Sequence, residues 1–193
     1  MKLHILASLV LPSILALPGL PPSLKGCTMT PASKKSLDGK IATITDARWD
    51  DGIIATSTAD AIRHGSCDNG SCKWIFHACH TDTNYNGMTF ALENKKYRNT
   101  FMYANIATGM SHLTQSLDKI CKISKRYEWI VYEADCNDSY YLFNLSYADW
   151  LDASDLGLVK HSKCSNNPYS TDSSCAYYRE LKFNDISDFE ESA

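Results

Sequence analysis

The sequence lacks the short motifs that usually reveal an enzyme, and it lacks the basic excess of a nucleic-acid-binding protein. It contains no G-x-S-x-G, H-E-x-x-H or G-x-x-x-x-G-K-[ST] pattern, so nothing marks a nucleophilic serine, a zinc-protease helix or a phosphate-binding loop. The 193-residue chain carries 19 Lys and Arg against 22 Asp and Glu, a formal charge of −3. Phosphate binding depends on basic stripes. The composition therefore argues against a nucleic-acid partner.

Long apolar runs are also lacking, except at the N-terminus. Lys2 precedes an apolar stretch at residues 5–17, which Pro12 interrupts and which is too short to span a bilayer. One charge, a short apolar segment and then small residues such as Ala16 are typical of a secretory signal peptide. We therefore predict that residues 1–17 are a signal peptide, that no segment spans a membrane, and that the protein is secreted.

The chain has no C-x-x-C pair, which argues against a zinc site. An even number of cysteines in an exported chain indicates disulfides. All eight follow the expected signal peptide, and we predict that they form four bridges: Cys27, Cys67, Cys72, Cys79, Cys121, Cys136, Cys164 and Cys175. Their spacing favours pairings that contain Cys164–Cys175 and Cys67–Cys72. The geometry of a helix followed by a returning strand argues against Cys121–Cys136.

Beyond the signal peptide the chain suits a single domain, and 44% apolar residues are enough for a core. Residues 18–36 are rich in Pro, Ser and Lys and predict an irregular arm. Residues 37–184 form the expected domain, and residues 185–193 an acidic, frayed tail. No internal repeat is evident.

Alternating or short apolar runs predict strands at residues 40–49, 73–81, 88–92, 99–105, 129–135, 139–147 and 176–183. Between Thr108 and Arg126, apolar residues at spacings of three or four predict an amphipathic helix, with the stripe Ile106, Met110, Leu113, Leu117 and Ile120. Shorter helices are expected at residues 59–64 and 149–158. The predicted fold class is α+β, an antiparallel sheet of five or six strands packed on one main amphipathic helix and stapled by disulfides.

One histidine cluster, His77-Ala-Cys-His80, lies on an expected strand. Side chains alternate along a strand, so His77 and His80 would face opposite sides and could not share a metal ion. Small secreted ribonucleases combine a histidine, a carboxylate and an arginine, because phosphoryl transfer needs an acid, a base and charge stabilisation. A composite site of that kind could be drawn from the following residues: His77 or His80, Glu128 or Glu133, and Arg98 or Arg179.

Several surface features leave alternatives open. The sequons at Asn69, Asn137 and Asn144 predict glycosylation in a eukaryotic source. Lys34-Lys35 could be a dibasic cleavage site or part of a solvated arm, and Lys125-Arg126 a cleavage site or the basic end of a helix. Four tryptophans, Trp49, Trp74, Trp129 and Trp150, could line a sugar-binding surface or form core.

A signal peptide, a short polar arm and one eight-cysteine domain without enzyme motifs resemble the small secreted cysteine-rich proteins of filamentous fungi, a class that includes plant-infection effectors and killer toxins. The segment from residue 99 through Thr108-Gly109 to Cys121 is similar to part of the virally encoded killer toxins with an α/β sandwich. The resemblance implies a monomer without a cofactor that acts by binding a host or competitor protein or cell-surface component, and not as an enzyme. The alternatives are a secreted hydrolase or ribonuclease using His77 or His80, and an extracellular carbohydrate- or ligand-binding module.

Overall fold

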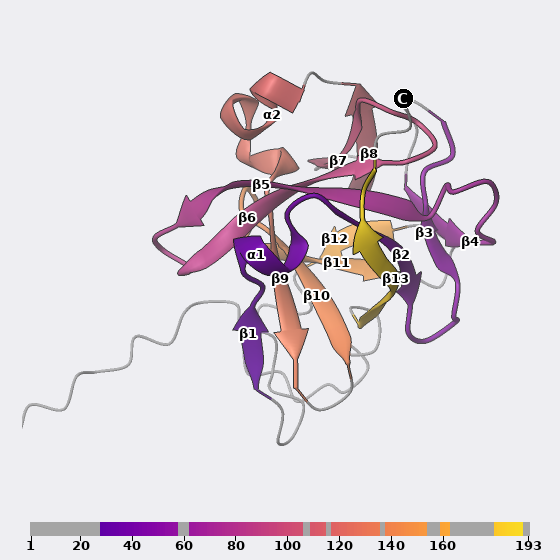
Figure 1. Cartoon of the computed structure of the whole chain (residues 1–193), viewed down its shortest axis with the longest axis horizontal. Coiled ribbons are helices and arrows are strands. Elements are labelled where there is room, and N and C mark those ends of the chain that lie inside the picture. Colours follow the sequence, from indigo (N-terminus) through magenta and orange to yellow (C-terminus); the bar gives the residue numbers. More distant parts are fainter. Residues whose placement is uncertain are drawn as a thin grey trace, which may run out of the picture.

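The computed structural model describes residues 28–57, 62–105, 109–114, 117–135, 138–153, 159–162 and 180–190. Within these ranges the chain is mostly strand, and its helices are short (Figure 1). The strands are β1 (Met29–Pro31), β2 (Lys40–Asp46), β3 (Gly52–Ile54), β4 (Arg63–Gly65), β5 (Lys73–Asp82), β6 (Gly87–Asn94), β7 (Thr100–Asn105), β8 (Gly109–Thr114), β9 (Trp129–Ala134), β10 (Ser139–Asn144), β11 (Asp149–Ala153), β12 (Val159–Ser162) and β13 (Leu181–Asp188). The helices are α1 (Lys34–Leu37), α2 (Leu117–Ile123) and the 3₁₀ turn η1 (Lys125–Tyr127). Within the described ranges, no helix has the length and apolar character to cross a membrane.

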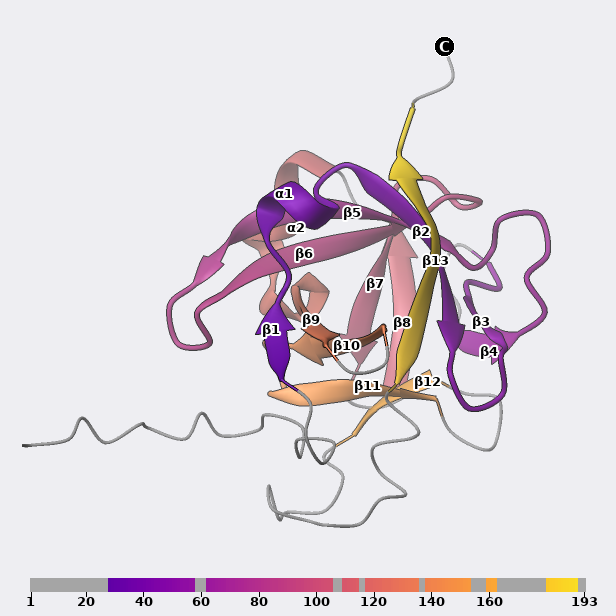
Figure 2. The same cartoon turned by 60° about the horizontal axis from the view of Figure 1, so that its bottom comes forward.

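Strands β2, β5, β6, β9, β10 and β13 close into a ring in which every neighbour is antiparallel. The hairpins β3–β4, β7–β8 and β11–β12 each lie between two successive ring strands in the chain (Figure 2). A closed ring leaves its strands without an unpaired edge. Six barrel strands with three intervening hairpins are the strand arrangement of a β-trefoil.

The predicted α+β class is therefore wrong, and the main amphipathic helix is absent. Its first half is strand β8, which pairs with β7 through Phe101↔Leu113 and Met102↔His112. The aromatic strand β7 provides a hairpin partner for this segment, and the pairing outweighs the helical spacing of its apolar residues. Only α2 remains helical. The sequence also predicts a helix at residues 149–158, but Asp149–Ala153 form strand β11. The helix expected at residues 59–64 overlaps strand β4, Arg63–Gly65.

The predicted strands fared better than the helices. Six of them overlap β2, β5, β6, β7, β9 and β10. Strand β13 begins at Leu181 and runs to Asp188, past the expected domain boundary at residue 184. Strand β1 and helix α1 lie inside the expected irregular arm, and β1 pairs with β9 from Met29↔Ala134 to Pro31↔Tyr132. That part of the arm thus belongs to the sheet.

The barrel core shows an internal threefold pattern that no repeat in the sequence announced. Ala42 pairs with Trp74, Phe90 with Trp129, and Tyr140 with Leu181. The first residue of each pair lies four residues before the end of its strand, β2, β6 or β10. Trp74, Trp129 and Leu181 are all fully buried. The two indoles donate to hairpin carbonyls, Trp74 Nε1 to Ile53 O at 2.8 Å and Trp129 Nε1 to Met102 O at 3.4 Å. The three repeats share the same strand pairing but not the same residues, so the repeat cannot be recognised from the sequence.

Two disulfides lie within the described residues. Cys67–Cys72 closes the turn at Asn69-Gly70, where the sequence favoured a bridge, and both turn residues have positive φ (49° and 77°), as a tight hairpin turn needs. Cys79–Cys121 joins β5 to α2. The other four cysteines, and with them the expected Cys164–Cys175 bridge, lie outside the described residues: Cys27, Cys136, Cys164 and Cys175.

Helix α2 supplies a matched pair of substitutions. Ile120 is fully buried beside Phe101 and Tyr127, whereas Leu117 is 43% exposed. We predict that Ile120→Ala lowers the free energy of unfolding by about 2–5 kcal/mol, and that Leu117→Ala lowers it by less than about 1 kcal/mol. Urea unfolding of the two variants, side by side with the unmodified chain, measures both. An equal loss would contradict the placement of α2.

Candidate functional site

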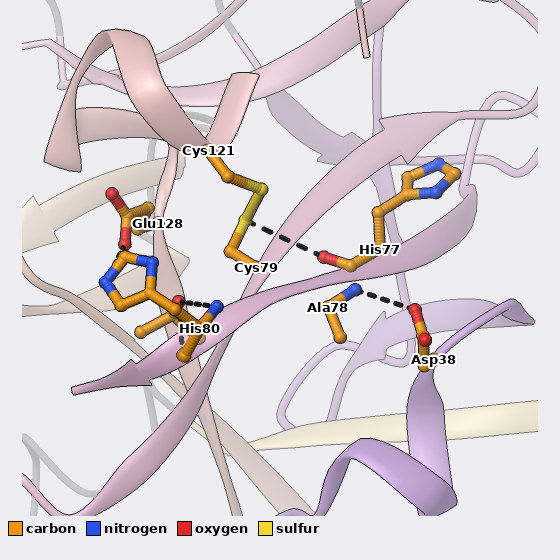
Figure 3. Close-up of a disulfide and its surroundings, with 8 residues drawn as sticks. Asp38, His77, Ala78, Cys79, His80, Cys121 and Glu128 are labelled. Carbon is orange, nitrogen blue, oxygen red and sulfur yellow. Dashed lines mark hydrogen bonds and ion pairs between the residues drawn. A yellow bond between two sulfur atoms is a disulfide. The ribbon is translucent and has the colours of Figure 1, made fainter. Parts of the chain in front are cut away.

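The two histidines of the cluster lie on β5 and point away from each other, with the Cys79–Cys121 disulfide between them (Figure 3). A register shift between Ala78 and Thr81 interrupts the pairing of β5 with β6 at this point. The His77 carbonyl faces Cys79 Sγ at 3.9 Å, on the strand side away from the His80 ring. The two imidazoles therefore do not act on a common ligand.

His77 belongs to a cluster in which both carboxylate oxygens of Glu93 accept hydrogen bonds. Its Nε2 lies 2.8 Å from Oε2 of Glu93, whose side chain is 2% exposed. The other oxygen, Oε1, accepts from Arg98 Nε and from the Asn99 backbone N–H, both at 2.8 Å. Burial by itself would raise the pKa of Glu93, but the hydrogen bonds from His77 and Arg98 outweigh burial and lower it to about 2. A carboxylate so acidic and so fully engaged is a poor proton carrier near neutral pH.

His80 pairs with a different glutamate. Its Nε2 lies 3.3 Å from Oε2 of Glu128, which is almost fully buried, whereas 47% of the His80 side chain is exposed. Burial raises the pKa of Glu128, although His80 and a hydrogen bond from Thr89 act in the opposite direction. The contact has the distance of an ion pair, but Glu128 Oε2 makes no well-aligned hydrogen bond. The contact therefore joins a half-exposed imidazole to a buried carboxylate.

The structure brings together one of the acid–base pairs expected from the sequence, His80 with Glu128, and it engages His77 with a different carboxylate, Glu93. Glu133 lies across from Thr30 and Tyr140 on the neighbouring strands, and Arg179 is outside the described residues. Arg98 does not clamp an open position, because it bonds Glu93 and stacks over Phe189 at 4.8 Å. Sequence reasoning missed Glu93. The β5–β6 hairpin, with Ile75↔Glu93 and His77↔Ala91, is the signal that could have placed Glu93 diagonally beside His77.

No three His, Cys, Asp or Glu side chains of the described residues come together in a way that could hold a metal ion.

A shallow groove of about 180 Å³ runs along the outer face of β2. On β2 it is lined by the consecutive residues Ile41, Ala42 and Thr43. Because β2 lies between β5 and β13 in the sheet, the groove has two different walls. The cationic wall consists of Lys73 and Lys95, and the acidic wall contains Asp185, Glu190 and the aromatic ring of Phe189.

The charges of the two walls face the groove without neutralising each other. Among the described residues, the side chains of Lys73, Lys95, Asp185 and Glu190 form no ion pair within 4.0 Å. Asp188 is held instead by Lys40, with Nζ 2.5 Å from Oδ1. Strand β13 reaches this position through a register shift between Asn184 and Ser187, where Asp185 has a φ of 55°. Such a bulge is a device that re-aims side chains.

The remaining surface predictions find varied positions. Asn69 is exposed at its turn, and Asn137 lies outside the described residues. Asn144 is fully buried and its Nδ2 donates to two backbone carbonyls, so a glycan on that nitrogen would displace both hydrogen bonds. Trp74 and Trp129 are core residues that no sugar reaches.

The dibasic sites differ from each other as well. Arg126 lies in η1 and donates from Nη1 to the Tyr103 hydroxyl at 2.6 Å. Lys34 and Lys35 lie on the exposed helix α1.

A scan of the sequence against protein-family models gives no match, and a search of curated protein sequences gives none either. Solved structures do match. A chain of a mosquitocidal holotoxin matches 79% of this chain with a TM-score of 0.54 and 14% identity. A chain of the cytolethal distending toxin of Actinobacillus actinomycetemcomitans matches 84% with a TM-score of 0.52 and 15% identity. An α-L-arabinofuranosidase matches 80% with a TM-score of 0.56 and 8% identity.

The share of each matched chain that this chain covers differs widely. This chain spans 17% of the mosquitocidal holotoxin chain and 32% of the arabinofuranosidase, but 99% of the distending-toxin chain. At these identities the likeness is one of fold. The fold of this protein is thus a β fold that it shares with bacterial toxins.

The Glu93 cluster leads to a stability prediction. Glu93→Gln keeps the shape of the side chain but removes the charge that receives His77 and Arg98, so we predict a loss of about 2–3 kcal/mol at neutral pH. Because folding lowers the pKa of Glu93, its contribution is present above the usual carboxyl range and is lost as the pH falls towards 2. Chemical denaturation of both proteins at neutral and acidic pH measures it. A gap between them that does not narrow in acid would contradict the assignment.

Proposed function

We propose that the protein is a secreted, toxin-like binding protein that recognises a host or competitor target through its β-trefoil, and that it does not act by acid–base catalysis. The observation that carries this proposal is the separation of the two histidines of the cluster. Each histidine pairs with its own buried glutamate, His77 with Glu93 and the half-exposed His80 with Glu128, and neither pair lines the groove on β2.

The fold supports a binding role. Two of the three matched structures described above are toxins by name. This chain covers almost the whole matched chain of one of them, the cytolethal distending toxin. A closed barrel with three hairpins presents loops and strand faces on a rigid frame, which is how recognition surfaces are commonly built. The toxin names among the matched structures support the expectation of a toxin-like protein. The likeness of residues 99–121 to the killer toxins gives no support, because residues 109–114 are strand and not helix.

The groove on β2 is the recognition surface that we propose. Lys73 and Lys95 face Asp185 and Glu190 across it without pairing, so a target that carries both an anionic and a cationic or hydroxyl group could neutralise the two walls together. Phe189 at the acidic wall offers an apolar contact. A few convergent polar groups beside an apolar contact are the usual composition of a small binding site.

A second candidate, a carbohydrate-binding module, has one observation in its favour. This chain matches about a third of an α-L-arabinofuranosidase, so the fold occurs there as one part of a larger glycoside-cleaving chain. The groove would serve that function as well, because acidic side chains and an aromatic ring suit sugar hydroxyls and sugar faces.

The test separates binding from catalysis. We predict that His77→Ala and His80→Ala each retain the binding of the labelled protein to intact yeast or plant cells, provided that circular dichroism shows a folded protein. We predict that Lys73→Glu combined with Lys95→Glu weakens the same binding at least about tenfold, since each desolvated charge contact contributes about 1 kcal/mol or more. Flow cytometry of labelled protein over a concentration series measures both effects.

The matched control is Lys119→Glu combined with Lys122→Glu on the exposed side of α2, which changes the net charge by the same amount away from the groove. Equal losses from the two double variants would indicate a general charge effect and reject the groove. A folded His77→Ala or His80→Ala variant that still binds the cells, but whose biological effect on them falls about 10²–10⁴-fold, would reject the binding proposal in favour of an enzyme. Competition by soluble arabinan, but not by unrelated polymers, would favour the carbohydrate-binding candidate.

A further inference from the structure

Four ring strands end in the same turn, and three of these turns are equivalent in the threefold pattern: Asp46 ends β2, Asn94 ends β6 and Asn144 ends β10. The fourth, Asp82 at the end of β5, lies outside that pattern. In each of the three equivalent turns, Oδ1 accepts the backbone N–H groups two and three residues further on. The distances are 2.8 and 3.1 Å from Arg48 and Trp49, 3.0 and 3.1 Å from Lys96 and Tyr97, and 3.1 and 3.4 Å from Ser146 and Tyr147. The pattern Asx-x-x-aromatic therefore recurs at roughly 50-residue spacing, near the long end of known repeat periods.

The second side-chain atom distinguishes the first turn from the other two. Asn94 Nδ2 donates to Ser71 O at 2.8 Å, and Asn144 Nδ2 donates to Arg126 O at 3.1 Å and Glu128 O at 3.2 Å. Asp46 has an oxygen where these residues have an N–H donor. That oxygen, Oδ2, is buried and has no hydrogen-bond partner, and the residue as a whole is 0% exposed.

The backbone on the far side of the turn is equivalent in the three repeats. The residue after each Asx donates its N–H to a neighbouring carbonyl: Ala47 to Glu180 at 2.9 Å, Lys95 to Lys73 at 2.9 Å, and Leu145 to Glu128 at 3.2 Å. In the second and third repeats, the amide donor of the Asx points to the carbonyl two residues before that acceptor. An ionised carboxylate in the first repeat would present two acceptor oxygens where the other repeats present an acceptor and a donor.

The charged neighbours of Asp46 do not compensate for its burial. His64 on β4 and Asp152 on β11 are the ionisable groups that act on it from the adjoining hairpins. His64 Nδ1 itself contacts Asp51 Oδ2 at 3.2 Å, and its ring stacks on Trp49 at 4.8 Å with an interplanar angle of 12°. Within the turn, the guanidinium of Arg48 lies over the Trp49 ring at 4.5 Å.

We propose that Asp46 is held as a neutral carboxylic acid at the position where Asn94 and Asn144 carry an amide donor, and that its ionisation in this buried place lowers the stability of the first repeat. The protein then has a single acid-stabilised repeat among three equivalent ones. Burial, the first cause, and Asp152 raise the pKa of Asp46, while the two turn N–H groups and His64 lower it, and the net direction is upward. The direction agrees with the comparison of the three turns.

The sign of the pH effect follows from that direction. A group whose pKa is raised by folding stabilises the folded protein fully below its unfolded pKa, and the stabilisation is lost as the pH rises through the folded pKa. The first repeat is therefore firmest in mildly acidic solution and loosens towards neutral and alkaline pH. Glu93 acts in the opposite direction at much lower pH, so the two effects are separable.

The test exchanges the residues between equivalent turns. We predict that Asp46→Asn raises the Tm at about pH 8 by at least about 3 °C, and by less at about pH 4, so that the dependence of Tm on pH flattens. Asn94→Asp and Asn144→Asp, the matched converse variants, should each lower the Tm more at about pH 8 than at about pH 4. Differential scanning calorimetry of the full chain across this pH range measures all three.

A direct measurement keeps the proposal falsifiable if a variant does not fold. In the unmodified protein labelled with ¹³C and ¹⁵N, the Asp46 carboxyl resonance, assigned by through-bond correlation to its own backbone, should titrate above the usual aspartate range of about 4. Titration of that resonance at or below the usual range would overturn the proposal. An Asp46→Asn variant less stable than the unmodified protein at about pH 8 would overturn it as well, because it would mean that the ionised carboxylate is the stabilising form.

Discussion

Closure of the barrel by β13 on β2 is the constraint on which the rest of the structure depends. These two strands lie at opposite ends of the chain and pair from Leu181↔Asp46 to Asp188↔Lys40. With them apart, β2 and β13 would each present an open edge, and the core around Trp74, Trp129 and Leu181 would open to water. Burying three such side chains contributes several kcal/mol by transfer alone, of the same order as a whole domain's net stability.

The same closure creates the surface features that bear on function. It brings the acidic residues after Asn184 beside Lys73 and Lys95, although they are far apart in sequence, and so forms the groove on β2. Within the ring, the β5–β6 hairpin places Glu93 beside His77, and the β6–β9 pairing brings Glu128 of the next repeat to His80. The frame therefore decides that the histidines are engaged separately, and the unpaired charges gather elsewhere.

Threefold pairing explains why equivalent positions can have different chemistry. The Asx turn that ends β2, β6 and β10 is kept by one acceptor oxygen, which both Asp and Asn supply. The other terminal atom of the side chain, Oδ2 in Asp or Nδ2 in Asn, does not take part in the turn and can therefore differ between repeats. In the first repeat the residue is Asp46, so a carboxyl group is buried there. A repeat architecture thus allows one of its three copies to acquire a dependence on pH while the other two hold the barrel.

The sequence by itself determined most strands, the turn at Asn69-Gly70 and its bridging cysteines, because alternation and turn chemistry are local properties. It did not determine the state of residues 109–114. Met110 and Leu113 suit a helix stripe, and only pairing with β7 makes this segment a strand. Nor could it bring Asp185 and Lys73 to one groove, since these neighbours come from the closure of β13 on β2. Ring closure is a long-range property, and tertiary structure alone decided it because the three repeats share pairing geometry rather than residue identity.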